Sequence, residues 1–482
     1  MTNVIQPKPD CNINNICDTD SYKYSHFLLY PKKMRKMFSY LEARGGEFAE
    51  CTIALLQVVI HKYLTKPITL ADIDVEEQFA LAHGEPFNRA SWEHIVHKYG
   101  GLPPVRIRAI PEGLVVPVLN AVMTIESDDD EVIAWATNYL ETQLCRIWYP
   151  SSIAIISREV KKVWKHFLEL SSDNPAAEIV FKHHDFGARG VTSREQAALG
   201  GAAHLFNFLG SDTVAGIKYA NHYYDCPMSG FSIPATEHST MTIFGREGER
   251  AALKTWIQKT LVERQVPAGV PKLSACVGDS YNIYNFVKMV CEEDIRSLIK
   301  GSGGTLVVRP DSGNPLEVLP NILNIFEENL PAGEIYVNTK GYKVLPDYLR
   351  IIWGDGINRR SMKPILQCLV DLGWSVSNIA FGSGGGLLQD VNRDTQKWAF
   401  KCSYVDVDGV SVDVRKDPIT DPGKRSKAGR LDLIKLPNGT YQTVALEDGQ
   451  LSHPDSVMVT YYENGSIYYN NTLDEVRARM AL

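Results

Sequence analysis

The side chains with the most chemical potential in this sequence stand directly after short apolar runs. Arg309 and Asp311 follow the run 306–308, and Asp279 follows the run 275–277. A guanidinium can hold phosphate oxygens in a fork, and a nearby carboxylate can accept ribose hydroxyls or the water shell of a metal ion. The arrangement therefore indicates a phosphorylated sugar, although a local ion pair at a surface turn would read the same way.

Two further clusters combine a ring with charge. Phe186 lies three residues before Arg189, which suits a flat, electron-poor ring held next to a phosphate. His238 follows Glu237 and can act as an acid, a base or a phosphate acceptor. A core phenylalanine, a surface arginine and a solvated histidine are the structural alternatives, so the residue types alone leave these roles open.

A glycine-rich segment, Gly-Ser-Gly-Gly-Gly at 382–386, follows the apolar run 379–381. Without Cβ atoms, consecutive backbone N–H groups can approach and point at one phosphate. The dinucleotide pattern GxGxxG fails because Leu387 occupies its last position, and no GxxxxGK[ST] sequence occurs. The segment is therefore either an anion-binding turn of another kind or a plain turn.

These groups need a scaffold that gathers strand ends, and the sequence predicts one. From about residue 175, apolar runs alternate with helical patterns such as 247–262 and 284–300. The alternation predicts a mainly parallel sheet, in which active groups sit where the strands end. The predicted strands are the runs 179–181, 208–209, 231–233, 275–277, 306–308, 351–353 and 379–381.

Outside this region the pattern is mixed. The segment 50–63 predicts a helix, and 105–118 predicts strands around a Pro-Glu-Gly turn. Asp408-Gly409 between alternating valines predicts a hairpin, as do Asn438-Gly439 and Asn464-Gly465.

Composition limits the classes of function. The chain has 482 residues, a formal net charge of −7 and 44% hydrophobic residues, which predicts a globular protein and argues against general nucleic-acid or anionic-membrane binding. No apolar run has the length of a membrane span, and the N-terminus lacks the apolar core of a signal peptide. Nine cysteines without a CxxC pair predict free thiols, no zinc site and a cytoplasmic location.

Taken together, the motifs resemble the nicotinamide phosphoribosyltransferase family over about residues 14 to 480. Several of the motifs are long and all occur in order, so their joint signal is stronger than any one of them. They are DSYK at 20–23, HDFGARG at 184–190, SDTVAG at 211–216, PATEHS at 234–239, GDSY at 278–281, VRPDSGNP at 308–315, WGDG at 353–356, FGSGGGLLQ at 381–389 and the basic segment 416–430.

The resemblance implies a type II phosphoribosyltransferase, with an irregular α/β barrel and a second mixed α+β domain. We expect an N-terminal mixed domain at 8–110, the barrel at 150–400, and strands and a helix at 401–482 that rejoin the second domain. The resemblance also implies a homodimer with active sites at the subunit interface. The expected reaction joins nicotinamide to phosphoribosyl pyrophosphate, giving nicotinamide mononucleotide and pyrophosphate. Mg²⁺ would bind mainly through the pyrophosphate, and ATP would be a coupled substrate.

The resemblance also assigns site residues. Phe186 stacks on the pyridine ring, with Tyr22 of the other subunit on the opposite face, and Asp212 accepts a hydrogen bond from the carboxamide. Pyrophosphate contacts fall to Arg189, His238 and Arg309, ribose contacts to Asp311, Gly354 and Asp355 with Asp279 nearby, and 5′-phosphate contacts to Gly384, Gly385 and Arg393. His238 also matches a histidine phosphorylated by ATP, and the expected catalytic set is His238, Asp212, Asp279 and Asp311.

Two departures from the family pattern concern the 5′-phosphate. Ala399 stands where a serine hydroxyl is expected, and Gly45 and Gly46 replace charged residues after Arg44. Arg44 and Lys401 are weaker candidates for the same phosphate.

Three other functions fit parts of the pattern. A nicotinate or quinolinate phosphoribosyltransferase would share the barrel, but an acidic substrate would favour a basic residue at position 212. A sugar-phosphate isomerase or oxidoreductase would leave Arg189, Asp212 and His238 without a task. A non-catalytic binding protein would be expected to lose its charged site residues, and every principal one is present.

Overall fold

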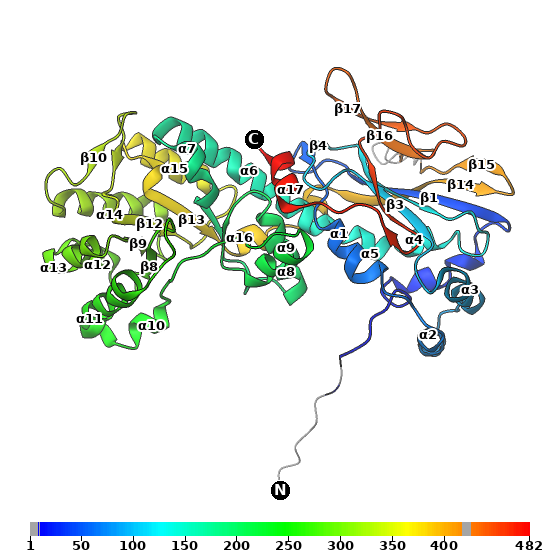
Figure 1. The fold of residues 1–482 in the computed structure, drawn as a ribbon, viewed down its shortest axis with the longest axis horizontal. Helices are drawn as coiled ribbons and strands as arrows, with labels where there is room; N and C mark the ends of the chain where they lie inside the picture. The colour runs from blue at the N-terminus through cyan, green and yellow to red at the C-terminus, as the bar shows by residue number, and fades with distance from the viewer. Residues whose placement is uncertain (1–7, 9, 417–425) are drawn as a thin grey trace, which may run out of the picture. The chain divides into compact units, whose positions relative to one another are not determined.

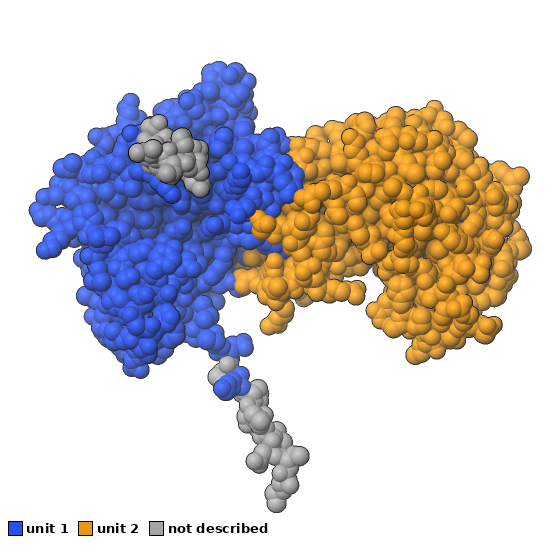
Figure 2. Space-filling view, turned by 180° about the vertical axis from the view of Figure 1, so that it is seen from behind, with its two compact units in different colours: residues 1–152, 393–479 blue, residues 153–392, 480–482 orange. Residues whose placement is uncertain are grey.

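The computed structural model describes residues 8, 10–416 and 426–482, so the part of the basic motif from 417 to 425 lies outside the described residues. The chain forms two compact units, coloured separately in Figure 2. Unit 1 comprises residues 1–152 and 393–479, and unit 2 comprises residues 153–392 and 480–482.

Unit 2 is built on a six-stranded sheet in the order β7-β6-β13-β12-β9-β8, with every pair parallel (Figure 1). The strands are β6 (His183–Asp185), β7 (Gly210–Ser211), β8 (Leu273–Val277), β9 (Thr305–Arg309), β12 (Leu349–Trp353) and β13 (Ile379–Ser383). Parallel strands need crossover connections, and helices supply them here. The helices are α6 (Trp148–Ser171), α7 (Pro175–Glu178), α8 (Arg194–His204), α9 (Val214–Tyr223), α10 (His238–Thr242), α11 (Gly245–Ile257), α12 (Ile283–Cys291), α13 (Glu293–Gly301), α14 (Pro315–Asn329), α15 (Met362–Asp371) and α16 (Gly385–Leu388).

The segment 231–236 closes this sheet into an irregular barrel. Phe231 forms a parallel bridge to Gly210 in β7, and Ala235 forms one to Ala275 in β8. One short segment thus bonds to both edge strands, which removes the exposed edges of the sheet. The expected α/β barrel is confirmed, with its seventh position filled by bridges rather than by a full strand.

The core of unit 2 lies between the sheet and its helices. Trp353, Phe381 and Trp164 are fully buried, and the rings of Trp164 and Phe381 lie 5.1 Å apart. Strands covered by helices read as nearly continuous apolar runs, which is why 306–308, 351–353 and 379–381 were recognisable.

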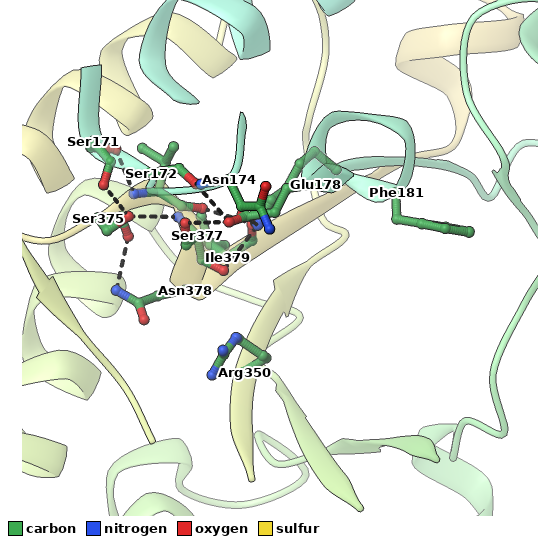
Figure 3. Close-up of polar contacts among 12 residues, drawn as sticks. Ser171, Ser172, Asn174, Glu178, Phe181, Arg350, Ser375, Ser377, Asn378 and Ile379 are labelled. Carbon is green, nitrogen blue, oxygen red and sulfur yellow. Dashed lines mark hydrogen bonds and ion pairs between the residues drawn. The ribbon is translucent and has the colours of Figure 1, made fainter. Parts of the chain in front are cut away.

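The amino ends of two neighbouring strands are joined by a buried lysine (Figure 3). Nζ of Lys182 donates to the carbonyls of Val376, Ser377 and Ile379 at 3.3, 2.9 and 3.2 Å and pairs with Oε2 of Glu178 at 3.0 Å. Oε1 of Glu178 accepts from two serine hydroxyls at 2.6 and 2.9 Å. Burial lowers the pKa of Lys182, and Glu178 opposes that shift. The network fixes the chain that enters β6 to the chain that enters β13.

Unit 1 contains a seven-stranded sheet in the order β15-β14-β1-β5-β3-β18-β19, and each pair in it is antiparallel. Its strands are β1 (Met34–Ala43), β3 (Val105–Ala109), β5 (Ala121–Ser127), β14 (Trp398–Val407), β15 (Val410–Asp413), β18 (Val459–Glu463) and β19 (Ser466–Ile467). The three strands from the N-terminal part, β1, β5 and β3, lie side by side in the centre, and C-terminal strands flank them on both sides, so both ends of the sequence build this one sheet.

Smaller elements surround that sheet. They are β2 (Glu50–Cys51), β4 (Val116–Pro117), β16 (Leu431–Lys435), β17 (Tyr441–Ala445), α1 (Leu56–Val59), α2 (Leu70–His83), α3 (Arg89–Tyr99), α4 (Ala136–Tyr139), α5 (Glu141–Cys145) and α17 (Leu473–Met480), and unit 2 adds the hairpin β10 (Tyr336–Val337) and β11 (Lys343–Val344). The predicted hairpins at 408–409, 438–439 and 464–465 are confirmed. Asp408 and Asn464 have positive φ, as do the glycines that follow them, which matches the twist of two-residue turns.

The strand expected at 208–209 is wrong, because β7 covers only Gly210–Ser211, and the run 231–233 forms a single bridge at Phe231 instead of a strand. Three further expectations differ from the structure. The run 179–181 is a 3₁₀ helix, and the strand begins at His183. The pattern 284–300 is two helices, α12 and α13, separated by the extended Glu292. The helix expected over 50–63 begins only at Leu56, because residues 50–51 pair as a strand with β4.

The late start of that helix has a tertiary cause. The buried carboxylate of Glu112 accepts the N–H groups of Leu55 and Gln57 at 2.8 Å each, and Leu55 takes a left-handed conformation with φ of 61°. A side chain from a distant segment thus caps the helix, and no local pattern reveals that.

No helix in the described ranges is both long enough and apolar enough to cross a membrane. All nine cysteines are free thiols, as expected.

Candidate active site

The carboxyl ends of the barrel strands carry the predicted residues of unit 2. Phe186 and Arg189 follow β6, Asp212 follows β7, and His238 follows the segment 231–236. Asp279 follows β8, Arg309 is the last residue of β9, and Asp311 comes two residues later. Gly354 and Asp355 follow β12, and Gly384 and Gly385 follow β13. Because the strands are parallel, these positions share one edge of the sheet.

The Phe186 ring lies against glycine backbone. The backbone N–H of Phe186 donates to the carbonyl of Ser383 at 2.9 Å, which fixes the Phe186 backbone beside β13. A Cβ on Gly382 would lie 2.0 Å from Cε2 of the ring, and one on Gly354 would lie 3.4 Å from both Cε2 and Oδ1 of Asp311. Glycine at 382 is therefore required for the ring to lie where it does. The same geometry brings the aromatic ring next to the Asp311 carboxylate.

His238 and Asp279 form a hydrogen-bonded pair in the same cluster. Nε2 of His238 lies 3.0 Å from Oδ1 of Asp279; the imidazole side chain is 46% exposed and the carboxylate only 5%. Oδ2 of Asp279 accepts the N–H of Asp311 at 3.1 Å and the hydroxyl of Ser312. Asp279 thus orients an accessible imidazole and fixes the backbone that carries Asp311.

Charge is concentrated around Asp311. Burial raises the pKa of Asp311; Arg309 and His238 act to lower it, while Asp279 and Asp355 raise it further. These five groups therefore interact within one region of the surface. Nε of Arg309 is buried and has no hydrogen-bond partner within the described part of the chain. An unpaired guanidinium nitrogen beside carboxylates suits a site that receives an anion with bound cations.

Asp212 is exposed, and its carboxylate accepts the hydroxyl of Ser232. Its N–H donates to the carbonyl of Asp185 at 2.9 Å. Asp185 is fully buried: Oδ1 accepts the N–H of Gly187 at 2.7 Å, and Oδ2 has no hydrogen-bond partner among the described residues. Burial raises the pKa of Asp185 to about 6; the N–H of Gly187 and the nearby side chain of Thr213 oppose this shift, and Asp212 adds to it.

The sequence analysis missed Asp185 and Ser232 as members of this region. Asp185 precedes Phe186 within the quoted HDFGARG motif, so its position was a usable signal. Ser232 offered none, because its contact with Asp212 crosses from one segment to another.

The glycine segment forms a tight turn into α16. Gly384 has φ −93° and ψ −105°, and a Cβ on Gly385 would lie 2.7 Å from Oε1 of Gln389. The first N–H groups of a helix have no intrahelical acceptor, so this turn points backbone donors away from α16. Arg189 lies exposed on the turn between β6 and α8.

Unit 1 carries the other predicted residues. Tyr22 is exposed in a 3₁₀ helix (Ser21–Tyr24). Arg393 is also exposed, and Ala399 is buried in β14, where it pairs with Glu42 of β1. The missing serine hydroxyl at 399 is therefore replaced by a methyl group inside the sheet.

Arg44, Arg393 and Lys401 belong to one cationic group in unit 1. Burial lowers the pKa of Lys401; Arg44, Lys416 and Arg393 lower it further, and Glu141 opposes them. Nε of Arg44 is buried without a hydrogen-bond partner among the described residues. Three cationic groups therefore act on Lys401, with one acidic neighbour, and such a concentration of positive charge is suited to bind a phosphate.

The described residues contain no group of three or more His, Cys, Asp or Glu side chains arranged to hold a metal ion. The carboxylates of Asp311 and Asp355 nevertheless interact closely enough to raise the pKa of Asp311. That donor set fits a Mg²⁺ ion that keeps its waters and takes substrate phosphates as ligands, rather than a metal held by protein alone.

The carboxyl ends of the barrel strands thus bring together an aromatic ring, arginines, carboxylates and a glycine turn, which suits a phosphorylated sugar held next to a flat ring. Comparison with known proteins agrees. Residues 181–454 match the family model for the nicotinate phosphoribosyltransferase (NAPRTase) family, and residues 14–107 match the model for the N-terminal domain of nicotinamide phosphoribosyltransferase. The chain belongs to the nicotinate phosphoribosyltransferase family.

Two curated relatives are similar over nearly their whole length. A nicotinamide phosphoribosyltransferase of Xanthomonas campestris pv. campestris is 46% identical over 96% of this chain and 97% of its own. One from Acinetobacter baylyi is 30% identical over 97% of each chain.

Two solved structures share the fold at lower identity. A nicotinate-nucleotide pyrophosphorylase from Pyrococcus furiosus has a TM-score of 0.58 at 16% identity, covering 96% of this chain and 93% of its own. Human nicotinic acid phosphoribosyltransferase has a TM-score of 0.55 at 16% identity, covering 96% and 92%.

Proposed function

We propose that this protein transfers the 5-phosphoribosyl group from phosphoribosyl pyrophosphate to nicotinamide, giving nicotinamide mononucleotide and pyrophosphate in NAD salvage. The observation that carries the proposal is the placement of Phe186 and Asp212 at the ends of adjacent strands, with Phe186 and Asp311 both lying against Gly354. The 46% identity to a protein named nicotinamide phosphoribosyltransferase supports it.

The nicotinamide subsite is formed by a ring and a carboxylate. Glycine backbone lies along the Cδ2–Cε2 edge of the Phe186 ring, and a pyridine ring would stack on a face of that ring. The exposed carboxylate of Asp212 can accept a hydrogen bond from a carboxamide N–H. Nicotinate would bring its own negative charge to this carboxylate, so Asp212 selects the neutral amide.

The phosphoribosyl subsite holds the ribose and the pyrophosphate, whose shared C1–O bond separates charge as it breaks. Positive charge develops on the ribose ring and negative charge on the departing pyrophosphate. Asp311 and Asp355 accept ribose hydroxyls, while Arg309, Arg189 and His238 hold the pyrophosphate oxygens. Attack by the pyridine nitrogen forms the C1–N bond as the C1–O bond breaks, so alignment suffices and no covalent nucleophile is needed.

The Asp311–Asp355 region would face the water shell of Mg²⁺ bound to the pyrophosphate, and the ion would neutralise charge on the leaving group. The protein's own contribution is to orient the ribose and to keep the ring stacked against Phe186.

We further propose that the site is completed in a homodimer. Tyr22 of the partner subunit would cover the second face of the pyridine ring. As candidate contacts of the 5′-phosphate we propose Gly384 and Gly385 in unit 2 and, separately, Arg393, Arg44 and Lys401 in unit 1. The unpaired Nε of Arg44 supports a role in anion binding.

We also propose that ATP stimulates the reaction through a phosphohistidine at His238. The ionised carboxylate of Asp279 can only accept a hydrogen bond, so Nε2 of His238 must donate it. Nε2 therefore carries the proton, and Nδ1 keeps the lone pair. Attack by Nδ1 on the γ-phosphorus forms the N–P bond, breaks the P–O bond and releases ADP.

A product assay tests the main proposal. The protein is incubated with phosphoribosyl pyrophosphate, Mg²⁺ and either nicotinamide or nicotinate, and the mononucleotide product is measured. Turnover with nicotinamide is expected. No turnover with nicotinamide would reject the proposal, and turnover with nicotinate alone would favour a nicotinate phosphoribosyltransferase.

A second assay tests the role of ATP. His238→Ala is expected to abolish ATP-stimulated synthesis while some basal synthesis remains, and Asp279→Asn to weaken the stimulation by loosening the imidazole. Full stimulation in His238→Ala would reject the phosphohistidine. Transfer of ³²P from γ-labelled ATP to the wild-type chain, lost in the variant, gives an independent readout.

A further inference from the structure

We propose that Arg359 is a positioning residue that fixes the loop after β12 to the glycine turn after β13. The inference rests on the proposed function, because these two segments carry the expected ribose contacts, Gly354 and Asp355, and the expected phosphate contacts, Gly384 and Gly385. Arg359 touches none of the reacting groups and acts through the backbone of both segments.

The two segments are already packed backbone to backbone. The hydroxyl of Ser383 donates to the carbonyl of Ile357 at 3.0 Å. A Cβ on Gly386 would lie 2.4 Å from that carbonyl oxygen and 2.8 Å from Cβ of Asn358. The glycine turn therefore rests directly on residues 357–358, and a small shift of one segment must displace the other.

Arg359, which follows residues 357–358, also connects the two segments through hydrogen bonds to Asp390, which follows α16. Its Nη1 donates to both the main-chain carbonyl and Oδ2 of Asp390, each at 2.9 Å. The Arg359 side chain is 7% exposed, whereas that of Asp390 is 43% exposed. Because the buried Arg359 guanidinium binds both the carboxylate and the main-chain carbonyl of Asp390, it fixes the backbone after α16 as well as the Asp390 side chain.

The next residue provides a natural comparison. Arg360 reaches the same carboxylate at 3.4 Å, but its side chain is 64% exposed. Both arginines follow Gly354 and Asp355 in one loop, yet only Arg359 is buried against the turn. A solvated ion pair contributes little, so the positioning is assigned to Arg359 rather than to charge in this loop as a whole.

The expected consequence is specific to one substrate. If the clamp is removed, the ribose loop and the phosphate turn lose their fixed separation, and binding of phosphoribosyl pyrophosphate weakens. Phe186 and Asp212, which form the pyridine subsite, make no hydrogen bond to Arg359 or Asp390 among the described residues. We therefore expect the KM for phosphoribosyl pyrophosphate to rise about tenfold and the KM for nicotinamide to change less than twofold.

The experiment compares Arg359→Met with Arg360→Met in the full-length enzyme. Both KM values and kcat are measured, and thermal melting checks that each variant is folded. Arg359→Met should show the selective rise, and Arg360→Met should resemble the wild type. Equal rises in both variants, or an unchanged KM for phosphoribosyl pyrophosphate in folded Arg359→Met, would overturn the proposal.

A second variant covers failure of Arg359→Met to fold. Asp390→Asn removes the charge from the exposed partner and should give the same selective rise, and combining it with Arg359→Met should add little further effect. A wild-type KM in Asp390→Asn would count against the clamp. If the wild-type enzyme itself makes no mononucleotide, the proposed function fails instead; turnover with unaltered KM values in both variants rejects only the role of Arg359.

Discussion

The two ends of the barrel sheet handle polar groups in opposite ways. At the amino ends, the buried Lys182 is paired with Glu178 and three carbonyls (Figure 3). At the carboxyl ends, Nε of Arg309 and Oδ2 of Asp185 are buried without hydrogen-bond partners among the described residues. Both ends carry a cationic group and a carboxylate with buried atoms, so the kinds of charge do not distinguish them.

The difference indicates what each end is for. A closed network lowers the free energy of the fold and has no donors left for a ligand. Unpaired groups cost stability in the free protein, and a substrate that pairs with them recovers that cost on binding. Substitutions at the two ends should therefore separate activity from stability.

The largest expected effect is on activity at the carboxyl end. Arg309→Met removes the guanidinium proposed to hold the pyrophosphate, and we expect kcat/KM for phosphoribosyl pyrophosphate to fall by about 10²–10³-fold, with no loss of thermal stability. Arg250→Met is the matched control, because this partly exposed arginine forms ion pairs only with Glu292 and Asp294 among the described residues. Comparable losses in both variants would remove the distinction.

The next effect is on stability at the amino end. Lys182→Met leaves the Glu178 carboxylate without its cation, and we expect a loss of about 2–4 kcal/mol in the unfolding free energy of unit 2. The KM values of the folded enzyme should not change. Adding Glu178→Gln should recover part of the loss in urea unfolding. A loss below about 1 kcal/mol would mean that the pair does not stabilise the sheet.

A smaller, pH-dependent gain is expected at Asp185. Its pKa is raised to about 6 from 3.8, so the folded state disfavours the ionised form, and this residue reduces stability as the pH rises from about 4 to 6. Asp185→Asn can keep the contact to Gly187 without the charge. We expect it to be about 1–3 kcal/mol more stable than the wild type at pH 7 and no more stable near pH 4. Denaturant unfolding across this range measures the gain, and a gain independent of pH would contradict the assignment.

The smallest effect concerns selection between substrates. Asp212→Asn removes the negative charge that nicotinate would meet, and we expect the ratio of kcat/KM for nicotinamide over nicotinate to fall about tenfold, or about 1.4 kcal/mol. Ser232→Ala keeps the charge and removes only its hydroxyl partner, so it should keep most of the preference. An unaltered ratio in Asp212→Asn would place selection elsewhere.

Much of the barrel could be predicted from apolar runs. The runs 275–277, 306–308, 351–353 and 379–381 lie within β8, β9, β12 and β13. The prediction failed at 179–181, because a run of three apolar residues has no clear period and the strand itself reads His-His-Asp. The order of the strands could not be predicted, since pairing joins segments as distant as β6 and β13.

The site shows the same division. The types and spacing of Arg309, Asp311 and the 382–386 glycines indicated phosphate and ribose before any fold was known, because anion binding needs fixed chemistry in short segments. The structure alone revealed the Phe186 ring on Gly382, the Asp279–His238 pair and the Arg359–Asp390 clamp.

By itself, the sequence determined which groups are present, that they follow strands, and that the strands form an α/β sheet. Only the tertiary structure decided which of those groups remain unpaired at the carboxyl edge and which neutralise one another at the amino edge. The reason is physical: residue type and spacing are local, whereas burial and hydrogen-bond pairing depend on segments that meet only when the barrel closes.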